Sequence, residues 1–331
     1  MQSTNEIFQK NLDEIALSLI NTFGLKFKQE EAHLSSPLLR WLDFRCRYVD
    51  PIPRPVAYSC KFPKVNLPAC AASGLASLVA KFKSGENVNP YQGRGLVLRN
   101  DISASKRHTR TDLLYADWNL LHFHLSNEPI PPGQFFSKPS DYLAFCLVGS
   151  NVAAVVDVLP HPDRSGFANT ELFETMAKSW PAYIEQFRLK GISGERELST
   201  LDISQMREAG LSTFSQYNGK LYMSPGGGIT SAATPLRLND IHSHLRRNVH
   251  ALATMIDDPT GQVRTTPRIQ QIYAPDFSLN LDSLGLSVRE NISQTHFIIK
   301  KPEVGGMITW QEEISDALSP QWAIDALSKA S

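Results

Sequence analysis

Three short apolar runs between residues 112 and 163, separated by residues that favour turns, constrain the fold of this chain more than any other feature. Each run has the length of a β-strand, and Gly149-Ser150-Asn151 between the second and the third is typical of a hairpin. The proline-rich segment 127–140 joins the first two runs with little regular structure. The stretch therefore predicts neighbouring strands at Leu120–Leu125, Tyr142–Val148 and Val152–Leu159.

Apolar residues at helical spacing predict helices before and after these strands. Gly85 is a typical helix stop, and Pro181 should kink or end another helix. An edge strand is expected at Val56–Cys60 and a short strand at Leu96–Leu98, while Asn218-Gly219 predicts a type I′ hairpin. The predicted helices cover residues 5–23, 36–49, 69–84, 170–187, 204–209, 239–256 and 321–330.

This pattern predicts an α+β fold, in which a helical N-terminal part packs on a small antiparallel sheet and a second α+β region follows. We expect three consecutive regions: helices and a proline-rich connector at 1–68, an α+β core at 69–190, and an α+β region at 191–331. A length of 331 residues suits two packed lobes or one elaborated domain. A hydrophobic content of 42% argues against wholesale disorder.

Cysteine usage and hydropathy indicate the compartment. The four cysteines form no CxxC pair and no disulfide framework. The N-terminus lacks the apolar region of a signal peptide, and no apolar run reaches the roughly 20 residues that span a bilayer. These features predict a cytoplasmic protein that does not enter a membrane.

Positive charge is concentrated in one part of a chain whose formal net charge is zero. Between Arg40 and Arg110, thirteen Lys and Arg residues face four Asp and Glu residues. This local excess is consistent with a surface that binds an anion such as RNA. The alternative is a solvated basic face that is balanced by acidic parts elsewhere.

Three histidines form the principal candidate site. His122 and His124 lie two apart on one predicted strand, so both imidazoles emerge on the same face of the sheet. His161 ends the third apolar run. Because the unperturbed pKa of histidine lies near neutrality, such residues can serve as acid and base. The alternative is that His122 and His124 line a half-buried face and bond to neighbouring groups.

The same residues allow a metal-binding hypothesis. His122, His124 and Glu128 follow the spacing H-x-H-x(3)-E, which resembles the first motif of the cupins and implies a metal inside a small β-barrel. The glycine that usually lies upstream of the cupin motif is not found, and Asp117 occupies that region. The later cupin motif P-x-G-x-x-H is absent after Pro131. Acid–base chemistry without a metal is therefore the preferred interpretation.

Two further segments carry residues that could contact phosphate. His242, Arg246 and His250 recur every four residues of a predicted helix and share one face, which could touch phosphates or could be an ordinary exposed face. Gly226-Gly227-Gly228 lacks the lysine of a phosphate-binding loop, so a tight or flexible turn is the better interpretation.

The order of elements resembles the RelE-like toxins of the barnase–EndoU–colicin–RelE ribonuclease group. The resemblance rests on Asp117–Leu125, Tyr142–Phe145 and Val155–His161 and covers roughly residues 69–190. It implies a helical part on a small antiparallel sheet whose strands carry the residues that cleave RNA, and an antitoxin or other protein as a partner. RelE-like toxins are much shorter, so residues 1–68 and 191–331 lie outside the resemblance.

From this evidence we predict a metal-independent endoribonuclease of toxin or phage-defence type that uses no cofactor. His122, His124 and His161 would share the acid–base work, and the phosphate or RNA would be held by Lys106, Arg107, Arg110 and Arg246. One alternative is a non-catalytic regulatory protein that binds RNA or another protein through its basic segment. A metal site at His122, His124 and Glu128 is the third possibility.

Overall fold

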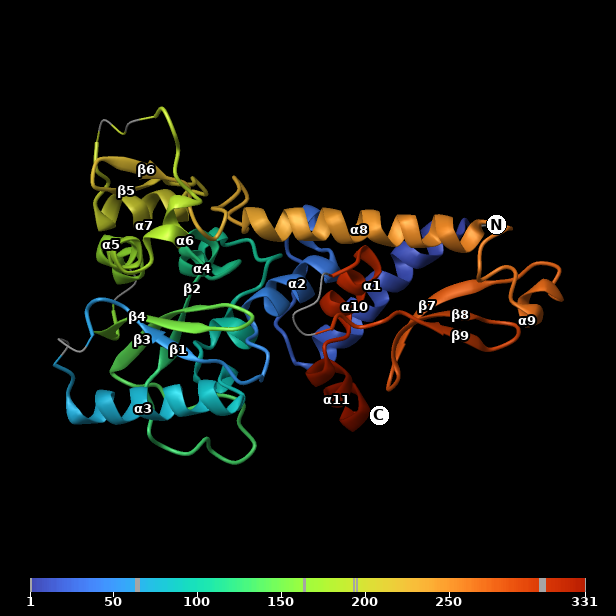
Figure 1. Cartoon of the computed structure of the whole chain (residues 1–331), viewed down its shortest axis with the longest axis horizontal. Helices are drawn as coiled ribbons and strands as arrows, with labels where there is room; N and C mark the ends of the chain where they lie inside the picture. Colours follow the sequence, from blue (N-terminus) through green and yellow to red (C-terminus); the bar gives the residue numbers. More distant parts are fainter. Residues whose placement is uncertain are drawn as a thin grey trace. The chain divides into compact units, whose positions relative to one another are not determined.

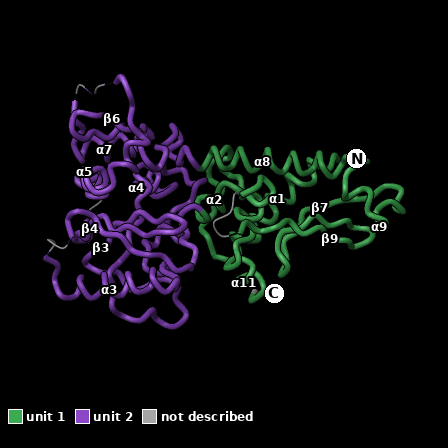
Figure 2. The backbone as a smooth tube through the Cα atoms, in the orientation of Figure 1, with its two compact units in different colours: residues 1–45, 238–331 green, residues 46–237 purple. Residues whose placement is uncertain are grey.

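The computed structural model describes residues 2–62, 66–162, 165–192, 194, 196–303 and 308–330. These residues form two compact units, one of residues 46–237 and one of residues 1–45 together with 238–331 (Figure 2). These two units do not coincide with the three consecutive regions expected from the sequence, whose boundaries lie at 68/69 and 190/191. The reason is that helix α1 (Thr4–Thr22) packs against strand β7 (Phe277–Asp282), far along the chain.

The unit of residues 46–237 contains a four-stranded sheet with the order β1-β4-β3-β2. The predicted antiparallel strands are present as β2 (Leu120–His124), β3 (Tyr142–Val148) and β4 (Ala153–Pro160). Strand β1 (Val56–Tyr58) forms the expected edge, but it runs parallel to β4, so the sheet is mixed.

Alternating side chains of this sheet enter two separate hydrophobic cores. On one face Leu121 and Phe123 pack with residues of α3 (Ala69–Ser84). On the other face Leu120 and Phe145 pack with residues of α5 (Thr170–Ser179), and the two helices lie on opposite sides of the sheet (Figure 1). Because side chains alternate along a strand, His122 and His124 share the α5 face with Leu120.

Local sequence signals account for several connections in this unit. Asn218 and Gly219 have φ values of 49° and 69°, as a type I′ turn requires, and they join β5 (Ser215–Tyr217) to β6 (Lys220–Tyr222). Pro181 separates α5 from α6 (Pro181–Glu185), as predicted. The other helices of the unit are α4 (Leu113–Trp118) and α7 (Thr200–Glu208).

The strand expected at Leu96–Leu98 is not formed. Residues Gly95–Arg99 instead form a π-helical turn, in which the amides of Arg99 and Asn100 donate to the carbonyls of Arg94 and Gly95. A three-residue apolar run satisfies few backbone groups as a strand unless it finds a partner, whereas the turn satisfies them locally.

The second unit combines helices with a three-stranded antiparallel sheet that the sequence did not predict. Its strands are β7, β8 (Gly285–Glu290) and β9 (Thr295–Ile298), in that order. Trp41 and Phe44 of α2 are fully buried, and the Trp41 indole N–H donates to the carbonyl of Ala317 at 2.8 Å. The helices that contribute to this unit are α1, α2 (Pro37–Arg47), α8 (Leu236–Asp257), α9 (Pro267–Gln270), α10 (Trp310–Leu318) and α11 (Gln321–Ala330).

Two expectations about the whole chain bear on the described residues. The four cysteines, Cys46, Cys60, Cys70 and Cys146, are all free thiols. Among the helices of the described ranges, none combines the length and the apolar character needed to cross a bilayer.

Candidate functional site

Strand pairing brings all three predicted histidines to one cavity of about 600 Å³. His122 and His124 reach it from β2, and His161 reaches it from the residue after β4. The backbone N–H of His161 donates to the carbonyl of Asp141, which lies just before β3. This places the imidazoles of His124 and His161 in a stacked arrangement, with ring centroids 5.6 Å apart and planes inclined by 26°.

Phe167 packs against two of the histidines in the cavity. Its ring centroid lies 5.0 Å from that of His122 and 6.2 Å from that of His161. The backbone carbonyl of Phe167 accepts a hydrogen bond from Nη1 of Arg207 at 2.9 Å. This hydrogen bond anchors the backbone of the residue whose ring contacts both imidazoles.

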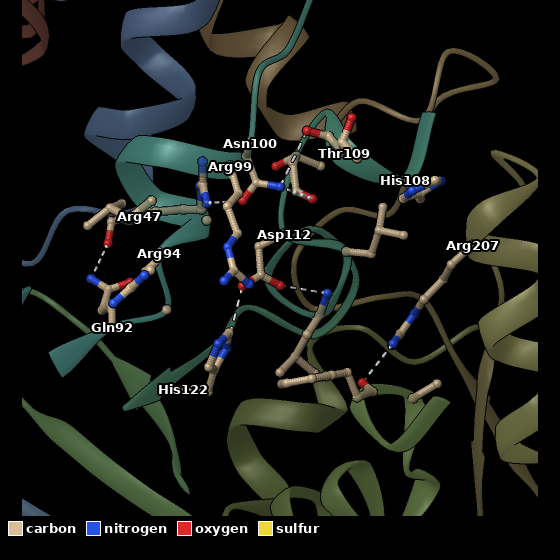
Figure 3. A pocket seen from close by; sticks show the side chains of 18 of the residues that line it. Arg47, Gln92, Arg94, Arg99, Asn100, His108, Thr109, Asp112, His122 and Arg207 are labelled. Atoms are coloured by element: carbon tan, nitrogen blue, oxygen red, sulfur yellow. Dashed lines mark hydrogen bonds and ion pairs between the residues drawn. The ribbon is translucent and has the colours of Figure 1, made fainter. Parts of the chain in front are cut away.

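Asp112 is the closest acidic neighbour of His122. Its Oδ1 accepts hydrogen bonds from the amides of Leu114 and Tyr115 and so caps the N-terminus of α4. Its Oδ2 lies 3.5 Å from Nδ1 of His122, and both side chains line the cavity (Figure 3). Asp112 was not among the residues predicted from the sequence, although an Asp placed directly before a short apolar run is a recognisable helix N-cap.

Three arginines supply positive charge to the cavity. Arg47, at the end of α2, is only 3% exposed, and its Nη1 donates to Oδ1 of Asn100 at 3.1 Å. Arg94 precedes the π-helical turn, Arg99 is its last residue, and both are exposed. All three lie around the cavity together with His122 (Figure 3). They belong to the basic segment 40–110, and the excess of positive charge in that segment is the sequence feature that could have identified them as site residues.

The four cations predicted to hold the phosphate lie elsewhere, and none of these described residues lines the cavity. Lys106 is exposed, and Arg107 donates to the carbonyl of Ala209 at 3.0 Å. Arg110 is 4% exposed and donates to the carbonyls of Ala104 and Ala232. Its guanidinium thus holds loops together, because buried carbonyls need donors.

Arg246 belongs to the other unit. Its Nη2 lies 2.8 and 2.9 Å from the two carboxylate oxygens of Asp13, so it joins α8 to α1. Its Nε donates to Nε2 of His242 at 3.1 Å, and burial lowers the pKa of that imidazole to about 4. The helix face of His242 and Arg246 is accordingly part of a polar contact within the fold.

Burial makes the strand histidines weak bases. It is the main cause that lowers the pKa of His122, with Asp112 acting against it and His161 and Arg47 acting with it. Burial likewise lowers the pKa of His124 to about 4, with contributions from His122, His161 and Arg94. Both imidazoles are therefore neutral near pH 7, the form in which a ring carries one donor and one acceptor.

The cupin-like metal set is not assembled. Glu128 forms an ion pair with Lys138, and Nδ1 of His124 accepts a hydrogen bond from the amide of Ser140 at 3.2 Å. Within the described ranges, no group of three or more His, Cys, Asp or Glu side chains is arranged to hold a metal ion. The spacing H-x-H-x(3)-E was misleading here because residues 126–128 leave the strand and turn Glu128 toward the loop that carries Lys138.

No protein-family model, no curated protein and no solved structure matches this chain. The function therefore has to be inferred from the cavity.

Proposed function

We propose that the protein is a metal-independent endoribonuclease whose active site is the cavity lined by His122, His124 and His161. The observation that carries the proposal is the convergence of these imidazoles, from two strands, beside Arg47, Arg94 and Arg99. Acid–base groups and fixed cations in one cavity are the two requirements of phosphodiester cleavage without a metal.

The chemistry uses the 2′-hydroxyl of RNA as the nucleophile. One neutral imidazole removes the 2′-hydroxyl proton as the 2′-oxygen bonds to phosphorus. A protonated imidazole gives its proton to the departing 5′-oxygen as the P–O5′ bond breaks. The products are a 2′,3′-cyclic phosphate and a free 5′-hydroxyl, and each histidine ends in the protonation state in which the other began.

The charge of the cavity favours an anionic substrate. Four arginines and two carboxylates, Asp112 and Glu208, are among the lining residues. One of these arginines, Arg207, is neutralised by a buried ion pair with Asp117. The other three arginines of the lining would hold the phosphate and stabilise the charge of its transition state.

The depth of the site indicates an unpaired substrate. The side chain of His122 is only 16% exposed, so a phosphodiester must enter the cavity to reach it. A volume of about 600 Å³ lies within the range of small-molecule sites and suits a nucleotide-sized segment. Single-stranded RNA can present such a segment, whereas a rigid duplex cannot.

Cleavage assays in the presence of EDTA test the proposal. Wild-type protein should cut single-stranded RNA to fragments with 2′,3′-cyclic phosphate ends, and RNA with 2′-deoxy nucleotides should resist. His122→Gln and His161→Gln should each lose at least about 100-fold in rate, the usual scale of a general acid or base. His296→Gln, in β9 of the other unit, is the matched control. Intact RNA, or cleavage that EDTA abolishes, would reject the proposal.

The same proposal includes a biological role: the protein acts as a toxin or in phage defence, and an antitoxin-like protein is its partner. Induced expression in bacterial cells should arrest growth, and His161→Gln should remove that effect at equal protein level. If RNA binds to the purified protein but stays intact, and arrest persists in the histidine variants, the non-catalytic binding function is the correct one.

A further inference from the structure

The three histidines of the cavity differ in the group that faces Nδ1. A carboxylate oxygen of Asp112 faces His122, the amide N–H of Ser140 faces His124, and a backbone carbonyl faces His161. Because the partner of one ring nitrogen decides which nitrogen carries the proton, these contacts assign different tautomers to the three rings.

We propose that Asp112 is a positioning residue that holds His122 in the Nδ1–H tautomer, so that Nε2 of His122 is the general base. The assignment rests on the proposed function for its chemistry, but the tautomer itself is a property of the folded protein. The contact with Ser140 gives His124 the opposite tautomer, in which Nε2 is a hydrogen-bond donor.

The two oxygens of Asp112 have separate tasks. Oδ1 accepts from the amides of Leu114 at 3.0 Å and Tyr115 at 3.2 Å, which orients the carboxylate at the start of α4. Oδ2 is thereby directed to Nδ1 of His122 at 3.5 Å. The side chains of Asp112 and His122 are 19% and 16% exposed, so the pair is largely shielded from water.

Nδ1 of His122 is buried and makes no hydrogen bond to another described residue within strict geometry. A buried polar atom without a partner is costly, and bonds of catalytic groups are often long before substrate binds. Of the charged groups acting on His122, Asp112 is the anion, while Arg47 and His161 oppose a positive charge on the ring. Closing the 3.5 Å gap gives Nδ1–H a strong acceptor.

The remaining histidines complete the set of roles. Nδ1 of His124 accepts from Ser140, so its neutral form carries the proton on Nε2 and cannot accept a proton there. Nδ1 of His161 lies 3.0 Å from the carbonyl of Pro162, which can only accept, so Nδ1 must be protonated. His161 is the exposed member of the three histidines. It is the residue that returns a proton to the 5′-oxygen.

Long-range ¹H–¹⁵N NMR spectra of the imidazoles test the tautomers without any activity. At pH 7.5, His122 should show Nδ1–H and His124 should show Nε2–H, with signals assigned from His122→Gln and His124→Gln spectra. In Asp112→Asn, the side-chain oxygen still caps α4, while the amide N–H₂ faces Nδ1 and reverses the tautomer of His122. A wild-type spectrum with His122 as Nε2–H would overturn the proposal.

Single-turnover kinetics supply the second measurement. Asp112→Asn should lower the cleavage rate by up to about 10⁴-fold, the size of the effect known for the same change in an Asp–His–Ser triad. Its affinity for 2′-deoxy-substituted RNA and its thermal midpoint should stay close to wild type. Asp141→Asn, an exposed carboxylate outside the cavity lining, is the control.

The outcomes separate the two proposals. If wild type cleaves RNA and Asp112→Asn cleaves equally fast, the positioning role is wrong and the nuclease stands. If the tautomers are as expected but no RNA is cleaved, the nuclease is wrong and the Asp112–His122 pair stands.

Discussion

Nη2 of Arg207 lies 2.7 Å from Oδ2 of Asp117, with both side chains at most 3% exposed. Nε of Arg207 bonds to the same oxygen at 2.8 Å, and the guanidinium lies 4.3 Å from the centre of the Trp118 ring. Ser224 donates its hydroxyl to the other oxygen of Asp117. Because Arg207 also donates to the backbone carbonyl of Phe167, this buried ion pair connects α4 and α7 to the residue whose ring contacts His122 and His161.

Breaking this ion pair should destabilise the protein strongly. Arg207→Met leaves the carboxylate of Asp117 buried without its cation, and we expect a loss of about 3–5 kcal/mol in the free energy of unfolding. Arg196→Met removes an ion pair with Asp202 whose arginine is 74% exposed, and it should cost less than about 1 kcal/mol. Urea unfolding of both variants measures the difference, and equal losses would contradict it.

Acidification from about pH 6.5 toward pH 4 should destabilise the folded protein through His124. Burial lowers the pKa of His124 from 6.5 to about 4 in the folded state, so the unfolded chain binds a proton between these pH values and the folded chain does not. The stabilising contribution of His124 to the free energy of unfolding is therefore fully present above about pH 6.5, and it is lost as the pH decreases toward 4.

The His124 contribution can be isolated by substitution. Between pH 7 and pH 5 it amounts to at most about 2 kcal/mol, and to less in practice because the ring is partly exposed. Between pH 7 and pH 5, the free energy of unfolding measured in urea should therefore decrease less for His124→Gln than for wild type. His33→Gln, at an exposed histidine, is the control. An unchanged pH dependence in His124→Gln would show that the pKa of this ring is not lowered.

Gly226 should not tolerate a side chain. A Cβ at this position would come within 2.4 Å of the Tyr115 carbonyl oxygen and 2.5 Å of that of Ala116, which are backbone atoms at the end of α4. Its own amide donates to the carbonyl of Asp117. We expect Gly226→Ala to lower the thermal midpoint by several degrees, because the loop must move away from α4.

The control for that substitution is Gly149→Ala in the β3–β4 hairpin. A Cβ there would meet its nearest neighbour, the Val152 carbonyl oxygen, at an ordinary 3.6 Å. Its thermal midpoint should be close to that of wild type. If both variants unfold at the same temperature, the close approach of Gly226 to α4 has no energetic role.

The arginines of the cavity should determine RNA affinity and its salt dependence. For a single strand, each phosphate contact contributes about 0.7 to the slope of log affinity against log salt concentration. Arg94→Gln and Arg99→Gln should each weaken binding of 2′-deoxy-substituted RNA and reduce that slope by about 0.7. Arg107→Gln should change neither, because Arg107 lies outside the cavity lining. The reverse result would favour the basic loop as the RNA-binding surface.

Short-range signals in the sequence determined the individual elements. Residues 120–125, 142–148 and 152–159 form strands within one or two residues of their predicted bounds, and Asn218-Gly219 forms the predicted hairpin turn. His122 and His124 were correctly placed on one face, because alternation along a strand is a local property of the backbone. The α+β fold follows from these elements.

Only the tertiary structure decided which residues meet. His161 reaches His124 through the pairing of three strands. Asp112 reaches His122 because it caps helix α4, and this helix is too short to be recognised in the sequence from the spacing of its apolar residues. Arg47, Arg94 and Arg99 face the cavity, whereas Arg110 of the same basic segment binds carbonyls, a choice that the local sequence does not encode. Residues 1–45 join residues 238–331 for the same reason: long-range packing depends on the complementary surfaces of segments far apart in the chain.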